Sequence, residues 1–352
     1  MRTILTTVGT SLLSNARRDL SLPHNELPSE QQVAHYLKLT PPEKASAETN
    51  SLSRLLSEGD GIIFLHSQTE EGQFCATALK RHYESSGYHA SHVEVPYLVY
   101  AESRFKMLGL RSLVAKLIEL IREVRKQGRE PQINATGGFK AEIAYATLVG
   151  LLFDLPVFYI HEAFRDIIEM PPTPIGWDYS LLAEQEDFLE WVYEEERLTS
   201  EVEERLRHRP SELRLLLTEV DNKTILAPTG EAFWEAYLDR LRESQSVPVY
   251  LSARAKSSYN SAEATIRALF DRTIAKLRVR DLRINGSDRV GNCDCLVFPK
   301  GHRTERLFYY ETEAGEIRVC ELARHSDQSY ERLIEKGVQR SDYDDFTIWM
   351  EG

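Results

Sequence analysis

Cysteine is scarce in this sequence, which has four among its 352 residues: Cys75, Cys293, Cys295 and Cys320. Four scattered cysteines are too few for a disulfide framework, and a single Cys-x-Cys pair is a weak metal motif. No apolar run approaches the roughly 18 residues that a membrane helix needs, and the N-terminal apolar run is too short for a signal peptide. We therefore expect plain thiols, no bound metal, no membrane partner and a cytoplasmic protein.

The common nucleotide-binding and hydrolase motifs are also missing. The sequence has no Walker motif and no GxGxxG fingerprint, so the ATPase and dehydrogenase classes lose their best support. Its last third has no Ser/His/Asp order and no convincingly spaced pair of carboxylates. Any chemistry there must rest on other residue types.

Basic residues are in deficit overall, with a net charge of −12, but the deficit is uneven. Residues 1–173 hold 18 basic and 20 acidic side chains, residues 174–249 hold 8 and 18, and residues 250–340 hold 17 and 13. The balances are therefore −2, −10 and +4. Residues 174–249 are therefore a poor candidate for binding nucleic-acid phosphates, whereas residues 250–340 are mildly basic.

Residues 1–170 alternate apolar strands with helical patterns. We expect strands at 2–8, 61–66, 93–99, 132–134 and 156–160, with helices at 72–83, at 103–127 and after residue 140. This alternation predicts an α/β, doubly wound Rossmann-like domain with a parallel sheet. Residues 21–50, rich in Pro, Ser, Glu and Thr, are expected to form a long insertion after the first strand.

The stretch Pro-Pro-Thr-Pro at 171–174 is the clearest linker. Residues 178–246 then predict helices and a wing, typical of a mainly α winged helix-turn-helix connector. Residues 247–352 predict a small α+β domain with a long helix at 258–280 and strands at 295–298, 306–312 and 316–322. Three domains are thus expected: 1–170, 178–246 and 247–352.

Two loops of the first domain suit an anion. The segments 6–11 (Thr-Thr-Val-Gly-Thr-Ser) and 134–140 (Asn-Ala-Thr-Gly-Gly-Phe-Lys) each begin at the end of an expected strand. A helix that starts at such a loop attracts phosphates through its free N–H groups and its dipole. In doubly wound sheets these loops gather at the carboxyl ends of the strands. The alternative is that the glycine pair is only a tight strand-to-helix turn.

Together these loops resemble the CARF (CRISPR-associated Rossmann fold) sensor family over roughly residues 1–170. The resemblance implies a homodimer formed through this domain, which binds a cyclic oligoadenylate, with cyclic tetra-adenylate as the expected ring. The loop at residues 66–69 (His-Ser-Gln-Thr) is a further candidate. The matched ligand-binding positions are Thr10, Ser11, Asn134, Thr136, Gly137, Gly138 and Lys140.

The polar functional groups of the last domain are mainly cationic. A basic cleft with a tyrosine suits cleavage of RNA by its own 2′-OH, because cations stabilise the phosphorane without a metal. A solvated basic face is the alternative. The residues concerned are Lys300, His302, Arg303, Arg306, Arg324 and Tyr330, with His325 nearby.

The order of these residues resembles the RelE family of ribosome-dependent mRNA interferases over about residues 247–340. The resemblance implies that Arg306 stabilises the transition state and that Arg324 is a general acid or charge stabiliser. Tyr330 would be the base or would orient the 2′-OH. Where the family has two lysines this sequence offers Lys300, with His302 or Arg303 as a substitute.

The two resemblances together predict a cyclic-oligoadenylate-activated, ribosome-dependent mRNA endoribonuclease of type III CRISPR defence that needs no cofactor for catalysis. The expected partners are a second copy of the chain, a ribosome with mRNA in its A-site, and a ribosomal protein that docks the acidic connector. The alternatives are a transcription regulator that binds DNA through 178–246 and a ring nuclease. A HEPN ribonuclease, suggested by the spacing of Arg318 and His325, is disfavoured because that motif needs a helix.

Overall fold

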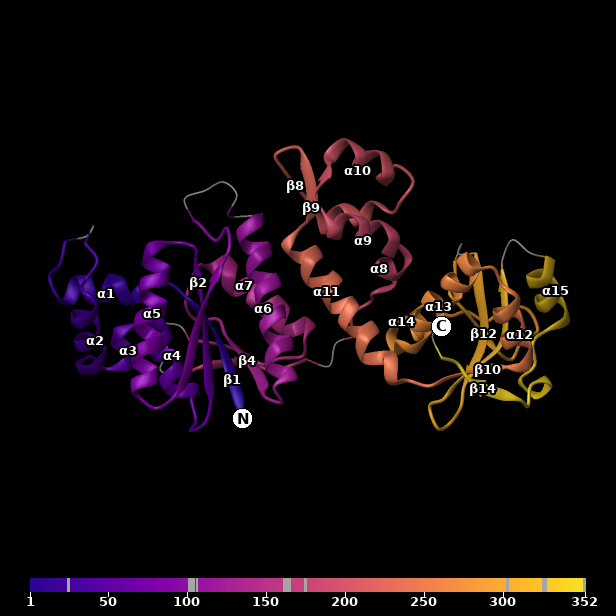
Figure 1. Ribbon diagram of the computed structural model, residues 1–352, viewed down its shortest axis with the longest axis horizontal. Helices are drawn as coiled ribbons and strands as arrows, with labels where there is room; N and C mark the ends of the chain where they lie inside the picture. The colour runs from indigo at the N-terminus through magenta and orange to yellow at the C-terminus, as the bar shows by residue number, and fades with distance from the viewer. Residues whose placement is uncertain are drawn as a thin grey trace. The chain divides into compact units, whose positions relative to one another are not determined.

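The computed structural model describes residues 1–23, 26–100, 105, 107–160, 166–173, 176–301, 304–324 and 328–350 (Figure 1). The chain divides into two compact units, residues 1–174 with 190–235, and residues 175–189 with 236–352. Two helices of the middle segment, α9 (Glu186–Glu194) and α11 (Pro228–Glu243), contribute residues to both units. The three domains expected from the sequence stay a prediction, while the mixed α/β class is confirmed.

The first unit contains a six-stranded sheet of order β3-β2-β1-β4-β5-β6. The first five strands pair in parallel, and β6 runs antiparallel to β5. The order 3-2-1-4-5 is that of a doubly wound, Rossmann-like sheet, and the chain reverses its direction of travel across the sheet between β1 and β4. The bounds are β1 (Arg2–Val8), β2 (Gly61–Ser67), β3 (His89–Val95), β4 (Glu130–Asn134), β5 (Val157–Tyr159) and β6 (Ile168–Met170).

Helices cover both faces of this sheet (Figure 1). Ile4 and Val8 of β1 pack into a core cluster with residues of α1, α2, α4 and α5. On the other face, α6 packs against β1, β3 and β4, and α7 packs against β4 and β5. The helices are α1 (Ser11–Asp19), α2 (Glu30–Leu39), α3 (Pro42–Ala45), α4 (Ala47–Leu55), α5 (Glu70–Ser85), α6 (Leu108–Lys126) and α7 (Lys140–Leu152).

The insertion at 21–50 is largely helical. Its serines cap helices: Ser29 and Ser46 each form a capping box, with Gln32 and Thr49 as the reciprocal partners. Part of the polar composition of this insertion is therefore explained by helix starts. The third strand also begins earlier than expected, at His89, because β3 is an edge strand whose residues 89–94 are half-buried or exposed.

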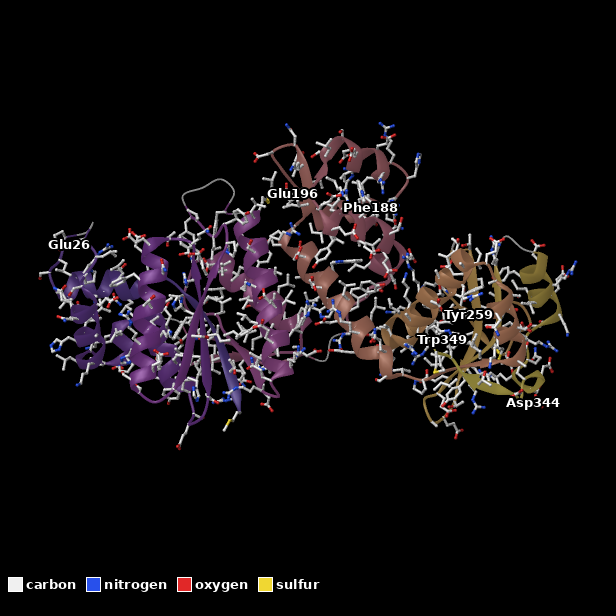
Figure 2. All side chains as sticks on the ribbon, in the orientation of Figure 1. Glu26, Phe188, Glu196, Tyr259, Asp344 and Trp349 are labelled. Carbon is white, nitrogen blue, oxygen red and sulfur yellow. The ribbon has the colours of Figure 1, made fainter. Side chains whose placement is uncertain are left out.

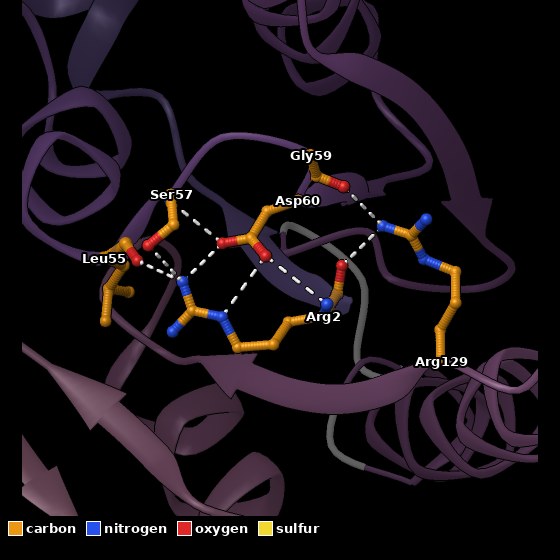
Figure 3. A network of polar contacts seen from close by, with 6 residues as sticks. All are labelled: Arg2, Leu55, Ser57, Gly59, Asp60 and Arg129. Atoms are coloured by element: carbon orange, nitrogen blue, oxygen red, sulfur yellow. Dashed lines mark hydrogen bonds and ion pairs between the residues drawn. The ribbon is translucent and has the colours of Figure 1, made fainter.

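A polar network closes the amino end of the sheet (Figure 3). Asp60 is 4% exposed and accepts hydrogen bonds from the Arg2 amide at 3.3 Å, from Arg2 Nε at 3.2 Å and from the Ser57 amide at 2.9 Å. Arg129 donates to the carbonyl oxygens of Arg2 at 2.6 Å and Gly59 at 3.0 Å. These bonds tie β1 to the start of β2.

The middle segment forms a small antiparallel sheet of order β7-β9-β8. Its acidic residues are partly neutralised: Glu196, on the surface in Figure 2, pairs with Lys223 at 2.9 Å. The elements are α8 (Ser180–Glu184), α9, β7 (Arg197–Leu198), α10 (Thr199–Leu206), the 3-10 helix η2 (Ser211–Leu216), β8 (Leu217–Val220), β9 (Lys223–Leu226) and α11.

Two partly buried ion pairs join α6 to the first half of α11 within the first unit. Arg111 contacts Glu231 at 2.8 Å, and Arg122 contacts Glu235 at 2.6 Å. The two carboxylates are only 4% and 6% exposed. Part of the negative charge of the middle segment therefore serves to hold it against the first sheet's helices.

The second unit contains a five-stranded sheet of order β11-β12-β13-β10-β14. β10 and β13 are parallel, and the remaining neighbours are antiparallel. Trp349 follows the edge strand β14, is 4% exposed, and lies near Tyr259 in Figure 2. The strands are β10 (Val249–Ser252), β11 (Leu296–Phe298), β12 (Glu305–Glu311), β13 (Ile317–Arg324) and β14 (Phe346–Ile348).

The prediction of one continuous helix at 258–280 is wrong. The chain forms two helices there, separated by Ala262 and Glu263 in extended conformation. The unit's helices are α12 (Ala253–Ser261), α13 (Ala264–Arg278), α14 (Arg280–Asn285) and α15 (Gln328–Lys336). Within the described ranges, no helix combines the length and the apolar character needed to cross a membrane.

Candidate functional site

The carboxyl ends of β1 and β4 lead into the two predicted anion loops, which lie against each other. A Cβ added to Gly9 would lie 2.7 Å from the backbone nitrogen of Gly138. Thr7 Oγ1 donates to the carbonyl oxygen of Gly137 at 2.6 Å. The two loops therefore form one surface at the point where the strand order reverses, which is where doubly wound sheets bind ligands.

A buried carboxylate lies directly behind this surface. Glu48 of α4 is fully buried, and it accepts hydrogen bonds from the Gly9 amide at 2.8 Å and from Ser11 Oγ at 3.3 Å. Burial raises the pKa of Glu48, although these bonds oppose the shift. A Cβ at Gly137 would lie 2.2 Å from Glu48 Oε1, so this position needs glycine for close packing. The Gly9 amide lies in a loop expected to bind a phosphate, but it already donates its hydrogen bond to Glu48.

A second buried carboxylate lies on the first turn of α7. Glu142 is 2% exposed, and burial raises its pKa to about 7, against hydrogen bonds from Tyr100 and from the backbone of Phe139. Among the residues that the structure describes, nothing hydrogen-bonds to Glu142 Oε1. Gly138 has a φ of +95°, and a Cβ there would lie 2.3 Å from Glu142 Oε2. Backbone conformation and packing therefore both require glycine at this position.

Two of the predicted ligand-binding side chains brace the loop from inside. Asn134 is fully buried, donates to Ser51 Oγ at 2.8 Å and accepts from Thr136 Oγ1 at 2.7 Å. Thr136 Oγ1 also accepts from the Ile160 amide at 3.2 Å. These side chains fix the shape of the loop and are not presented to solvent.

The other predicted positions differ in access. Ser11 is half-buried and accepts from the Ala47 amide at 3.0 Å. Thr10 and Lys140 are exposed, and Gly138 is half-exposed. Of the matched set, these last three positions are open to a ligand, and Lys140 is the first residue of α7.

The loop at 66–69 is held by internal bonds. His66 is 2% exposed, and its Nε2 lies 3.2 Å from His92 Nδ1. Thr69 caps α5 by accepting from the Gly72 amide at 3.0 Å. Burial, His66 and Lys80 lower the pKa of His92, which favours the neutral form of this histidine.

Sequence analysis missed three groups at this edge, namely Glu48, Glu142 and an aromatic cluster. The rings of Tyr100, Phe105 and Phe139 pack together, with centroids of Tyr100 and Phe139 4.0 Å apart. Glu142 could have been found as the third helical residue after Phe139, a position typical of a capping carboxylate. Glu48 carries no such local signal, because it reaches the loop through the fold.

In the second unit, Arg306 and Tyr330 come together. The guanidinium carbon of Arg306 lies 5.9 Å from the centroid of the Tyr330 ring. Arg306 donates to the carbonyl oxygens of Glu305, at 2.8 Å, and Gly301. The two side chains are 3% and 8% exposed, and Tyr330 also packs against Phe308. Among the residues that the structure describes, both side chains are therefore buried and do not line an open cleft.

Two of the remaining basic candidates lie close to Arg306 along the chain or across the sheet. Arg324 ends β13 opposite Glu305 and is half-buried, and Lys300 is exposed after β11. His302, Arg303 and His325 lie outside the described residues. Arg318 lies in β13, so the helix that the HEPN alternative needs is not formed there. The four cysteines carry free thiols, and the described residues contain no group of three or more His, Cys, Asp or Glu placed to hold a metal.

Comparison with known proteins finds a family match in the first unit. Residues 43–173 match the model of a family described as CRISPR-associated protein (Cas_APE2256). This part of the chain is therefore similar to CRISPR-associated proteins. The match includes Glu48, the aromatic cluster and the whole β4–α7 loop.

Likeness to solved structures is slight. Protein VC1899 from Vibrio cholerae is 12% identical with a TM-score of 0.31, over 69% of this chain and 68% of that one. Can2 from Sulfobacillus thermosulfidooxidans, solved in complex with cyclic tetra-adenylate, is 11% identical with a TM-score of 0.25, over 93% and 79%.

Proposed function

We propose that the chain is an effector of type III CRISPR defence whose first unit is a CARF-type sensor of cyclic oligoadenylate. The observation that carries this is the loop at the start of α7. It lies at the switch point of the sheet, inside the segment that matches the CRISPR-associated family, and it exposes Gly138 and Lys140. A helix start attracts phosphate, and a lysine beside it adds charge.

Cyclic tetra-adenylate is the ligand that we expect, bound by a homodimer of first units. A ring of identical nucleotides presents the same phosphate and base more than once, and so suits a site made of two identical halves. The exposed groups of each half would be Thr10, Gly138 and Lys140.

Titration calorimetry of the full chain with cyclic tetra-adenylate tests the sensor. Lys140→Ala removes one charge-assisted contact and should weaken binding roughly 10- to 100-fold. Lys126→Ala is the matched control, because Lys126 is an exposed lysine at the C-terminal end of α6, away from the loop before α7. Equal affinity of wild type and Lys140→Ala would contradict the assignment. Bulky variants of Gly138 are unsuitable, because they would displace Glu142.

We propose that the second unit is a metal-independent endoribonuclease of RelE type, which cuts mRNA in the ribosomal A-site. The 2′-OH would attack the adjacent phosphorus, lose its proton to a base and expel the 5′-oxygen, which takes up a proton. The products are a 2′,3′-cyclic phosphate and a 5′-OH. Support comes from the approach of Arg306 to Tyr330, which are 24 residues apart on β12 and α15.

The end groups of the cleaved RNA test this proposal. Ribosomes translating a labelled mRNA should yield 2′,3′-cyclic phosphate ends only when cyclic tetra-adenylate is added. Arg306→Ala should slow cleavage about 10²- to 10³-fold, as loss of one preorganised donor commonly does. Arg318→Ala, a half-exposed arginine on the neighbouring strand, is the control. A 3′-OH product would exclude the 2′-OH mechanism.

We further propose that the acidic middle segment docks a basic ribosomal protein and thereby tethers the enzyme to its substrate. Residues 175–189 pack with the second unit, where Lys276 pairs with Glu186, so a truncation at residue 247 would disturb that unit. A charge-reversal variant avoids this disturbance: Glu201→Lys with Glu204→Lys replaces two exposed carboxylates of α10. Cleavage should then fall at low ribosome concentration and recover at high concentration. Unchanged cleavage at low concentration would rule out the tether.

A further inference from the structure

The start of α7 carries an exposed aromatic ring. Phe139 is the N-cap residue of this helix and is 52% exposed. Its ring centroid lies 4.0 Å from that of Tyr100 and 6.2 Å from that of Phe105. One side of the ring is thus packed on aromatic neighbours while much of it faces solvent, which is unfavourable for a large apolar group unless something covers it.

The neighbours hold Phe139 in place. Tyr100 hydrogen-bonds to Glu142, on the first turn of the same helix, and burial followed by this carboxylate raises the pKa of the tyrosine far above its usual range. The backbone of Phe139 also hydrogen-bonds to Glu142. The ring of Phe139 therefore already packs on Tyr100 and Phe105 before any ligand arrives, which reduces the conformational entropy lost on stacking.

Three chemistries meet within four residues. Phe139 offers an aromatic face, the start of α7 with Lys140 attracts an anion, and Glu142 Oε1 is a buried acceptor for which the described residues supply no donor. A base, a phosphate and a hydroxyl or amine donor are the complementary groups, and one nucleotide contains all three.

We propose that Phe139 is the base-stacking residue of the sensor: an adenine ring of the bound cyclic oligoadenylate stacks on Phe139, and the attached phosphate lies at the start of α7. This inference rests on the ligand of the proposed function. It goes further in assigning base recognition to a residue outside the matched set, between Gly138 and Lys140.

The test uses the full chain and cyclic tetra-adenylate in which one adenine is replaced by 2-aminopurine, whose fluorescence is quenched on stacking. Stacking on an aromatic side chain is worth about 1–3 kcal/mol per base, so Phe139→Ala should weaken binding roughly 5- to 150-fold. Phe139→Leu should also lose the quenching, because it keeps an apolar side chain without a ring. Phe139→Trp should bind and quench like wild type. Leu39→Ala is the control, since Leu39 is a 67% exposed apolar residue of the same unit.

The outcomes separate the two proposals. If the wild type binds the labelled ring and quenches its fluorescence while Phe139→Leu does neither, the inference holds. If wild type binds but Phe139→Leu and Phe139→Ala match it, the inference is overturned and the sensor assignment stands. Loss of the dimer in sedimentation with quenching unchanged would assign Phe139 to contact with a second copy and would also overturn it. If wild type fails to bind the ring, the proposed function itself is wrong.

Discussion

Replacing Glu142 by glutamine should stabilise the protein at alkaline pH and change its stability little at pH 5. Burial raises the pKa of Glu142 from 4.5 to about 7, so the folded protein keeps this proton over a range in which the unfolded chain has released it. Between about pH 4.5 and 7 the native state therefore binds more protons, and the free energy of unfolding falls as pH rises. Above pH 7 the accumulated cost is about 3 kcal/mol. Glutamine stays neutral and can still accept from Tyr100 and the Phe139 amide.

Thermal and urea unfolding of the wild type and Glu142→Gln at pH 5 and pH 8 measure this effect. We expect the variant's advantage to be below about 1 kcal/mol at pH 5 and about 2–3 kcal/mol larger at pH 8. Glu119→Gln is the control, because Glu119 is 52% exposed and pairs with Lys116 on the surface of α6. An advantage that is equal at the two pH values, or larger at pH 5, would refute the reasoning.

Three further variants probe the packing and the chemistry. Burial would raise the pKa of Asp60, but hydrogen bonds from Arg2 and Ser57 outweigh burial and hold the pKa below its usual value. Asp60→Asn should therefore lower the free energy of unfolding, measured in urea at pH 7, by about 3 kcal/mol. This loss should shrink as pH falls below about 4. Gly137→Ala should cost about 1–3 kcal/mol because its methyl group overlaps Glu48, whereas Gly128→Ala, with a φ of +71° and open space around it, should cost about 1 kcal/mol in the same assay. Tyr330→Phe should slow ribosomal mRNA cleavage about 10²- to 10³-fold while lowering the melting temperature less than Tyr330→Ala does. Cleavage at the wild-type rate by Tyr330→Phe would remove the hydroxyl from the mechanism.

Local patterns in the sequence were enough to find most strands of the first sheet. Apolar runs such as 2–8 and 61–66 are buried strands, and a parallel sheet buries both faces, so their signal is strong. The edge strand at 89–95 was misplaced because its alternation is weak and its apolar content low. The two helices on either side of Ala262 were merged because helical spacing continues across the short break.

Sequence also located the loop at the start of α7, because a glycine pair between a strand and a helix start has a local physical meaning. That this loop binds an anion stays a prediction. It did not show which groups of the motif are open. Asn134 and Thr136 belong to the motif, yet their side chains are buried and bonded to Ser51 and Ile160. Those partners lie on α4 and after β5, and only the sheet order brings them to the loop.

By itself, the sequence determined that a strand–glycine–helix loop with a lysine stands in an α/β domain, because these features depend on neighbours within a few residues. The tertiary structure alone decided that Glu48, which lies 89 residues before Gly137, fills the space behind it. It alone decided that Glu142 is buried enough to hold its proton near neutral pH, and that Phe139 stays exposed on Tyr100. Burial and electrostatic shifts are properties of packing between distant segments, and no local pattern of residues encodes them.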